Sequence, residues 1–466
     1  MPDFDTYLSP FTWRYGTPPM RLLWSEKNKR LLWRQLWVAL AEVQSEYGLV
    51  KPEQAADLRI HMSEINLARS MEIEADIQHD LMAELRTFAE QCPVGGGIIH
   101  LGATSTDIED NTDALRMQAG LEIILKSLSS LLETISLLIE KWADTPLIAF
   151  THLQPAEPST LGYRLALYGQ DLLYDFKKIK DQASGIRGKG FKGAVGTSAS
   201  YAELLGADSL EEFEGKLSKR IDLPFFPVSS QVYPRKQDYD VVSTLAGLGA
   251  SLHKMAFDLR ILQSPSIGEL AEPFGEKQVG SSAMPFKRNP IRAEKINSLA
   301  RYLASFQGIA WDNAANSLLE RTLDDSANRR ILLPEACLVA DELLRTANII
   351  LSRLHIDEAA MKRNLEIYGP FAGTERVLIA MVKAGADRQE MHERIRSHSL
   401  KAWEFTRLGK ENPLVADLCR DAEISEYLSE AEVHSLMQAG SHVGDAPRRA
   451  KALAKSIQEY IINYMH

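Results

Sequence analysis

The sequence has little of what marks secreted, membrane or nucleic-acid-binding proteins. Its 466 residues include three cysteines, Cys92, Cys337 and Cys419, which form no CxxC pair, so neither a disulfide framework nor a zinc ribbon is expected. No stretch approaches the ~18 apolar residues of a membrane span, and the N-terminus lacks the basic start and apolar run of a signal peptide. A formal net charge of −10 disfavours nucleic-acid binding through bulk electrostatics. We therefore expect a cytoplasmic protein that binds neither membranes nor nucleic acids.

Two short motifs resemble binding signatures but lack the required context. The stretch GKGFKG, Gly188 to Gly193, matches GxGxxG but follows a predicted helix instead of a strand, so a connection between helices is the favoured interpretation, with Arg187, Lys189 and Lys192 available to an anion. The stretch HERIRSH, His392 to His398, lacks the HExxH spacing, which favours two solvated histidines. Because the eleven histidines show no cluster, we expect no metal and no cofactor.

Helical periodicity dominates the middle of the chain. From Thr104 to about Asp144, apolar residues recur at steps of three and four: Leu121, Leu125, Leu128, Leu132, Ile135, Leu138 and Trp142. One helix of that length spans about 55 Å at ~1.5 Å per residue. Further apolar residues widen its buried face: Ile123, Ile124, Leu131 and Leu137. Such a helix belongs inside a bundle.

Four more segments show the same pattern, at 158–186, 237–265, 290–318 and 327–354, with polar or Pro/Gly-marked breaks between them. Shorter helices are predicted before and after. The sequence therefore predicts an all-α chain of three domains: an N-terminal helical domain (1–103), a central long-helix bundle (104–356) and a C-terminal helical domain (357–466).

Polar clusters lie at the predicted joints of these helices. In GSSAMPFKRNP, Gly280 to Pro290, Asn289 is predicted to cap the next helix, whose positive end with Lys287 and Arg288 could bind an oxyanion. The simpler alternative is a surface loop before a capped helix. In GATSTDIEDNTD, Gly102 to Asp113, the hydroxyl residues Thr104, Ser105 and Thr106 begin the longest helix, where N-capping is the simpler interpretation.

Two histidines and an arginine cluster are further candidates. His152, in the proline-marked joint THLQPAEPST, could act as an acid or base near neutral pH or simply be solvated. His79 is followed by Asp80, which is either its partner or a surface carboxylate. The stretch ERTLDDSANRR places Arg321, Ser326, Arg329 and Arg330 near one helix start, which suits phosphate binding or a salt-bridged turn.

Taken together, these stretches resemble the fumarase/aspartase superfamily of lyases, whose signature GSSxMPxKxNP stands here at 280–290. Other segments resemble the adenylosuccinate lyase family within it, essentially end to end: Arg14–Tyr15, His79–Asp80, GATS at 102–105, THLQPA at 151–156, Gln231 in SSQVYPRK, and RTLDDSANRR at 321–330. The resemblance implies β-elimination of fumarate from adenylosuccinate, giving AMP, and from succinylcarboxamide imidazole ribotide, in purine nucleotide biosynthesis.

The resemblance also implies residue roles. Ser281 would be the catalytic base on a closing lid, His152 the acid and His79 its support, while Lys287 and Asn289 would stabilise the dianion. The implied substrate-binding residues are Arg14, Tyr15, Asp80, Thr104, Ser105, Gln231, Lys295, Arg321, Ser326 and Arg330. No metal is implied.

The superfamily's architecture implies a homotetramer whose core is the central bundle and whose active sites are each completed by three chains. Two rival enzymes share the signature loop, argininosuccinate lyase and carboxymuconate cycloisomerase, but neither accounts for Arg14–Tyr15 together with RTLDDSANRR. A catalytically idle scaffold, as some lens proteins of this superfamily are, could lose Ser281, His152 or Lys287, and all three are present.

Overall fold

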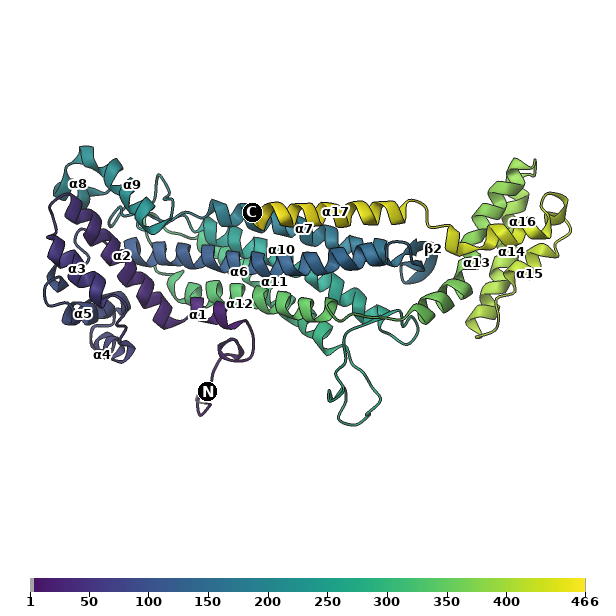
Figure 1. Cartoon of the computed structure of the whole chain (residues 1–466), viewed down its shortest axis with the longest axis horizontal. Helices are drawn as coiled ribbons and strands as arrows, with labels where there is room; N and C mark the ends of the chain where they lie inside the picture. Colours follow the sequence, from purple (N-terminus) through teal and green to yellow (C-terminus); the bar gives the residue numbers. More distant parts are fainter. Residues whose placement is uncertain (1–3, 466) are drawn as a thin grey trace. The chain divides into compact units, whose positions relative to one another are not determined.

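The computed structural model describes residues 4–465 and is mostly helical, with two short two-stranded sheets (Figure 1). It divides into two compact units. Unit 1 comprises residues 1–128, 175–252 and 298–345, and unit 2 comprises residues 129–174, 253–297 and 346–466. The sequence predicted three domains that follow one another along the chain, whereas these two units are each made of several separate segments. The three-domain division stays a prediction.

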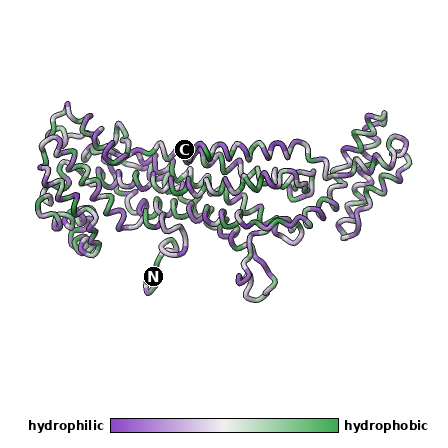
Figure 2. Tube along the Cα trace, viewed as in Figure 1, coloured by the Kyte–Doolittle hydropathy of each residue, from purple (hydrophilic) through white to green (hydrophobic). Residues whose placement is uncertain are grey.

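Five long helices each contribute residues to both units: α6 (Ser105–Lys141), α7 (Leu161–Gly185), α10 (Lys236–Leu262), α11 (Ile291–Ala315) and α12 (Ser326–Leu351). Their ends lie within three residues of the predicted ones. Hydrophobic and hydrophilic residues alternate along their turns (Figure 2). On α6, Leu121, Leu128 and Leu132 are fully buried as predicted, but Leu137 is 57% exposed, because Ile139 takes the buried position on that turn.

Unit 1 carries the shorter helices of the N-terminal part and of the 199–221 segment: α1 (Pro18–Leu23), α2 (Glu26–Glu46), α3 (Pro52–His61), α4 (Leu67–Ile77), α5 (Asp80–Gln91), α8 (Ala199–Leu205) and α9 (Leu210–Ile221), with 3-10 turns at Pro10–Thr12, Gly96–Ile98 and Ala207–Ser209. Aromatic residues fill the core between them, among them Trp33, Trp37, Phe88 and Phe213. This core fixes the positions of α2, α5 and the start of α6, where predicted site residues lie.

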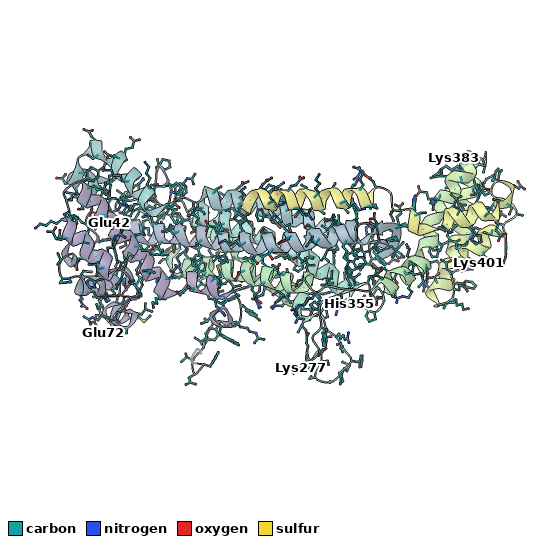
Figure 3. All side chains as sticks on the ribbon, viewed as in Figure 1. Glu42, Glu72, Lys277, His355, Lys383 and Lys401 are labelled. Atoms are coloured by element: carbon teal, nitrogen blue, oxygen red, sulfur yellow. The ribbon has the colours of Figure 1, made fainter. Side chains whose placement is uncertain are left out.

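Unit 2 ends in α13 (Glu358–Lys383), α14 (Arg388–Arg407), α15 (Leu414–Cys419), α16 (Glu430–Met437) and α17 (Ala446–Met465), with 3-10 turns at Ile424–Glu426 and Ala439–Ser441. Strands β3 (Leu270–Ala271) and β4 (His355–Ile356) pair antiparallel. After β3 the chain leaves the helices as a long loop that returns at α11, and Lys277 on this loop and His355 on β4 are labelled in Figure 3. Within residues 4–465, no helix is both long and apolar enough to cross a membrane.

The joint that contains His152 is a β-hairpin, which the sequence did not predict. Strands β1 (Pro146–Thr151) and β2 (Gln154–Thr160) pair antiparallel, and Thr151 pairs with Gln154, so the turn consists of His152 and Leu153. Both turn residues have positive φ, 53° and 58°. Tight hairpins require this conformation, but it normally falls to Asn and Gly, and costs other residues roughly 1 kcal/mol or more each. The strained turn presents an exposed His152 at its tip.

The GKGFKG stretch connects α7 to α8 and wraps around the side chain of Asp107, in the first turn of α6. Lys189 is fully buried, and its ammonium group donates to the Asp107 carboxylate and to the carbonyl oxygen of Gly193 (2.9 Å). The backbone N–H groups of Lys192 (3.1 Å) and Gly193 (3.1 Å) donate to the same carboxylate. The predicted helix connection is confirmed, but Lys189 is not available to an external anion, and Lys192 pairs with Glu214.

Replacing Asp107 tests this attachment. We expect Asp107→Asn to lower the free energy of unfolding by about 3–5 kcal/mol, because it leaves the Lys189 ammonium group buried without its counter-charge. Urea unfolding followed by circular dichroism measures the effect. The matched control is Asp208→Asn at an exposed position, which should change stability by less than about 0.5 kcal/mol. Equal stabilities for the two variants would contradict the assignment.

Candidate active site

Eight of the predicted substrate and catalytic residues line one cavity of about 460 Å³ in unit 1: His79, Asp80, Thr104, Ser105, Gln231, Arg321, Ser326 and Arg330. They come from four separate stretches of the sequence. Glu74, Gln78, Thr106, Glu109 and Leu323 complete the lining. A smaller cavity shares several of these residues, including Asp80, Arg321 and Arg330, and extends toward Lys29 and Arg116.

Helix starts position the polar groups. His79 is the N-cap of α5: its Nδ1 accepts a hydrogen bond from the backbone N–H of Met82 (3.4 Å). This assigns the proton of the neutral ring to Nε2, which lies 3.5 Å from the hydroxyl of Ser105, the first residue of α6. The hydroxyl of Thr106 donates to the carbonyl oxygen of Gln231. These contacts hold α5, α6 and the 229–235 segment around the cavity.

The cavity wall carries two arginines, each beside an acid. Arg330 forms an ion pair with Asp80 (2.8 Å), and Arg321 with Asp325 (2.8 Å). Asp80 is therefore neither a surface carboxylate nor chiefly a partner of His79, from which it lies 3.9 Å. Burial by itself raises the pKa of Asp80, but Arg330 and Lys29 hold it below its ordinary value. A half-exposed guanidinium group such as that of Arg330 can exchange its carboxylate for a ligand phosphate.

A buried network of arginines and aspartates joins the segments behind this wall. Arg235 donates to Asp110 on α6 (3.0 and 3.2 Å) and to Asp325 before α12 (2.5 Å). Arg329 donates to Asp238 on α10 (2.7 Å) and to the hydroxyl of Tyr233 (2.7 Å). Arg329 was a phosphate-binding candidate, and the structure instead gives it this buried structural role. Each charge has a counter-charge, as burial requires.

Sequence reasoning missed Glu109. It follows Ser105 by four residues on α6, so the two side chains share a helix face, and this spacing was the available signal. Burial, followed by the charges of Asp80, Asp110 and Asp113, raises the pKa of Glu109 to about 8, with Arg330 opposing the shift. At neutral pH its carboxyl group is therefore mostly protonated and can donate a hydrogen bond into the cavity.

The signature loop, residues 280–290, lies in unit 2. The hydroxyl oxygen of Ser281 accepts hydrogen bonds from the backbone N–H groups of Ala283 (3.4 Å) and Met284 (3.1 Å). The side-chain amide of Asn289 donates to the carbonyl oxygen of Gly280 (2.8 Å), which ties the two ends of the loop together. Lys287 is exposed.

The predicted helix start after Pro290 is confirmed, but its cap differs. The carboxylate of Glu272 accepts from the backbone N–H groups of Arg292 (3.0 Å) and Ala293 (2.9 Å) in the first turn of α11. Glu272 precedes the loop by eight residues, so no local pattern could identify it as the cap. The helix end predicted to bind an oxyanion is thus already occupied by a carboxylate.

Other predicted site residues do not line the cavity. Arg14 and Tyr15 follow the first 3-10 turn of unit 1, where Arg14 lies over the Trp13 ring (5.6 Å) and Tyr15 packs against Phe11 (5.6 Å). His152 and Lys295 belong to unit 2. Their predicted roles stay predictions.

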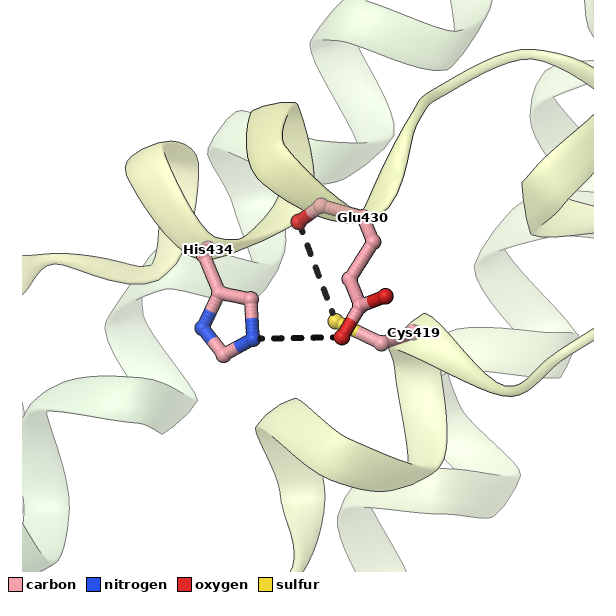
Figure 4. A group of neighbouring side chains, drawn as sticks. All are labelled: Cys419, Glu430 and His434. Carbon is pink, nitrogen blue, oxygen red and sulfur yellow. Dashed lines mark hydrogen bonds and ion pairs between the residues drawn. The ribbon is translucent and has the colours of Figure 1, made fainter.

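Two histidines have side-chain neighbours that the sequence did not predict. His398 of the HERIRSH stretch is not simply solvated, because its Nε2 lies 2.7 Å from Asp421. His434, which the sequence placed in no cluster, lies beside Cys419 and Glu430 in an arrangement able to hold a metal ion (Figure 4).

Comparison with known proteins identifies the family. A family profile described as "Lyase" matches residues 26–303, and one described as "Adenylosuccinate lyase C-terminus" matches residues 370–453. Adenylosuccinate lyase of Saccharomyces cerevisiae is 38% identical over 471 residues, covering 99% of this chain and 96% of that protein. The Schistosoma mansoni protein of the same name is 39% identical, covering 94% and 91%. The chain belongs to the adenylosuccinate lyase family.

Solved structures confirm the predicted fold class. A 3-carboxy-cis,cis-muconate lactonizing enzyme from Pseudomonas putida superposes with a TM-score of 0.86 at 24% identity, covering 96% of this chain and 99% of that one. A fumarate lyase from Mesorhizobium sp. BNC1 gives 0.84 at 23%, covering 97% and 99%. At 23% and 24% identity the similarity to these two structures concerns the fold alone. The sequence identities of 38% and 39% to adenylosuccinate lyases therefore decide between that family and the rival lyases considered from the sequence.

The raised pKa of Glu109 has a consequence for stability. The folded state keeps the Glu109 proton up to about pH 8, whereas the unfolded chain loses it near pH 4.5. Between these values the folded state binds more protons, so the free energy of unfolding falls as pH rises. We expect Glu109→Gln to remove this decline and to exceed the wild type in stability by about 1 kcal/mol or more at pH 9.

Urea unfolding at pH 5.5 and pH 9 measures this difference. Glu203→Gln, at an exposed position on α8, is the matched control and should follow the pH dependence of the wild type. A wild type and a Glu109→Gln variant with identical pH dependence would show that Glu109 ionises normally.

Proposed function

We propose that this chain is a carbon–nitrogen lyase that eliminates fumarate from adenylosuccinate, giving AMP, and from succinylcarboxamide imidazole ribotide, in purine nucleotide biosynthesis. One observation carries the proposal: four distant segments place His79, Ser105, Gln231, Arg321 and Arg330 around a single cavity. The end-to-end similarity to adenylosuccinate lyases supports the same conclusion.

The cavity suits an anionic nucleotide. Arg321 and Arg330 supply positive charge beside the hydroxyl of Ser326, which is the residue set for a phosphate and ribose. In the same cavity, Thr104, Ser105 and Gln231 offer hydroxyl and amide groups for the carboxylates of a succinyl group. Asp80 orients Arg330 through their ion pair. Arg14, Tyr15 and Lys295 are proposed as further contacts to the nucleotide.

The reaction removes a proton from a carbon next to a carboxylate, so a dianion must be stabilised while the carbon–nitrogen bond breaks. We assign the base to Ser281. Two backbone N–H groups already point at its hydroxyl oxygen, and such donors favour the alkoxide form that the role requires. Lys287 and Asn289 on the same loop would stabilise the dianion, and closure of the loop would exclude water.

The departing nitrogen needs a proton. We assign the acid to His152, which the hairpin turn presents to solvent, and a supporting role to His79, whose Nε2 proton is directed at Ser105. The backbone strain at His152 supports this assignment, because strained turn residues persist where position matters more than stability.

We further propose that the chain works in the cytoplasm as a homotetramer, with each active site completed by three chains. Three free cysteines are compatible with a reducing compartment. The residues that line the cavity all belong to unit 1, whereas Ser281, Lys287, Asn289 and His152 belong to unit 2. Sharing between subunits would bring these groups to one substrate.

The assignment of Ser281 is tested by cleavage of adenylosuccinate, followed by absorbance. We expect the wild type to release AMP and fumarate, and Ser281→Ala to lower kcat/KM by about 100-fold or more with the oligomer intact. The neighbouring Ser282→Ala is the matched control, because Ser282 lies on the same exposed loop without an assigned role. A wild type inert toward both succinyl nucleotides would refute the proposed function. An active Ser281→Ala variant would refute only the assignment of the base.

Shared sites make a separate prediction. Ser281→Ala and His152→Gln chains, each inactive alone, are refolded together in equal amounts. If Ser281 and His152 of one site come from different chains, random mixing restores both residues in about one quarter of the sites. Activity recovered to that extent, with a tetramer by sedimentation, would support shared sites. No recovery in a mixed tetramer would show that one chain supplies both residues.

A further inference from the structure

The last part of unit 2 brings together three side chains that the proposed reaction does not use. Cys419 ends α15, and Glu430 and His434 lie one turn apart on α16 (Figure 4). The Nε2 atom of His434 lies 3.8 Å from Oε1 of Glu430, and Sγ of Cys419 lies 3.9 Å from the carbonyl oxygen of Glu430. One potential ligand atom from each residue lies within 4.8 Å of the other two.

The scaffold that holds these side chains is well defined. Leu418 and Val433, the neighbours of Cys419 and His434 in the sequence, are buried in one hydrophobic cluster that joins α15 to α16, and Cys419 packs against it. A capping box between Ser429 and Glu432 fixes the first turn of α16 and therefore the position of Glu430. The backbone thus holds the three residues in place, and only the outer side-chain torsions remain to be set.

The chemistry of the three groups selects the ion. A thiolate, an imidazole and a carboxylate are the ligands that zinc prefers, whereas magnesium and calcium prefer oxygen alone. Zinc bonds of about 2.0–2.3 Å require ligand atoms to close to roughly 3.5 Å from one another, which is about 1 Å of side-chain movement here. His434 and Glu430 are exposed enough to make that movement.

The surroundings favour a cation. The segment 414–437 carries six carboxylates and one arginine. Three of these carboxylates, Asp417, Asp421 and Glu423, pair with Lys401, Arg394 and His398 of α14, so the negative charge next to the site comes from Glu426, Glu430 and Glu432.

We propose that Cys419, Glu430 and His434 bind one zinc ion, with water as the fourth ligand, and that this ion links α15 to α16. The site lies outside the residues assigned to fumarate elimination, so the proposal does not rest on the proposed function. It predicts a structural role: zinc should raise the thermal stability of unit 2 without entering the reaction.

Cobalt and zinc titrations of the full chain, freed of metal by a chelator, test the site. We expect one equivalent of Co²⁺ to give a near-ultraviolet thiolate-to-cobalt absorption band, which Zn²⁺ removes by displacement. Cys419→Ser should abolish the band, and both Cys419→Ser and His434→Gln should weaken Zn²⁺ binding at least about tenfold. Both variants should also lose the rise in melting temperature caused by Zn²⁺, while their lyase activity is unchanged.

His392→Gln is the matched control, because His392 is an exposed histidine on α14 of the same unit. It should leave the cobalt band and the zinc affinity as in the wild type. The proposal would be overturned by a wild type without a stoichiometric thiolate band, or by a zinc affinity that Cys419→Ser leaves unchanged.

Discussion

The candidate active site depends on the buried pairing of Arg235 with Asp110 and Asp325. A single guanidinium group joins α6 to the segment before α12, and its own segment carries Gln231 to the cavity. Since removing one partner of a buried pair strands a charge, the three segments cannot separate independently. Burial alone raises the pKa of Asp325, yet Arg235 and Arg329 hold it below its ordinary value, so this carboxylate stays charged across the neutral range.

Unit 1 contains two classes of arginine. Arg329 and Arg235 are buried and have fixed partners, whereas Arg330 is half exposed and pairs with one carboxylate at the cavity wall. The rigid pairs hold the wall in place, and the exposed pair can exchange partners with a ligand. Glu109 adds to the same cavity a group whose protonation follows solution pH.

Sequence periodicity was sufficient for the five long helices, because their apolar faces repeat every three to four residues and prolines mark the joints. Sequence patterns did not predict the hairpin, because Pro155 and Pro158 argue against a strand and mark the segment as a joint between helices. The His152–Leu153 turn also lacks the Asn-Gly pair that is typical of tight hairpins. The cap supplied by Glu272 and the contact of Cys419 with α16 depend on tertiary structure. The resemblance to lyases selected eight cavity residues but overlooked Glu109, and it also named Arg14 and Tyr15, which do not line the cavity.

With His152 as the proposed acid, the strained His152–Leu153 turn sets folding stability against activity. Glycine at position 153 would relax a backbone that leucine holds at a φ of 58°, and screens that reward heat resistance alone would select such a change early. The same change would let the tip of the hairpin sample other directions, and the neighbouring imidazole with it. Under the proposed role of His152, thermal stability gained at this turn would come at the expense of catalytic precision, and engineering for stability should leave the turn unchanged.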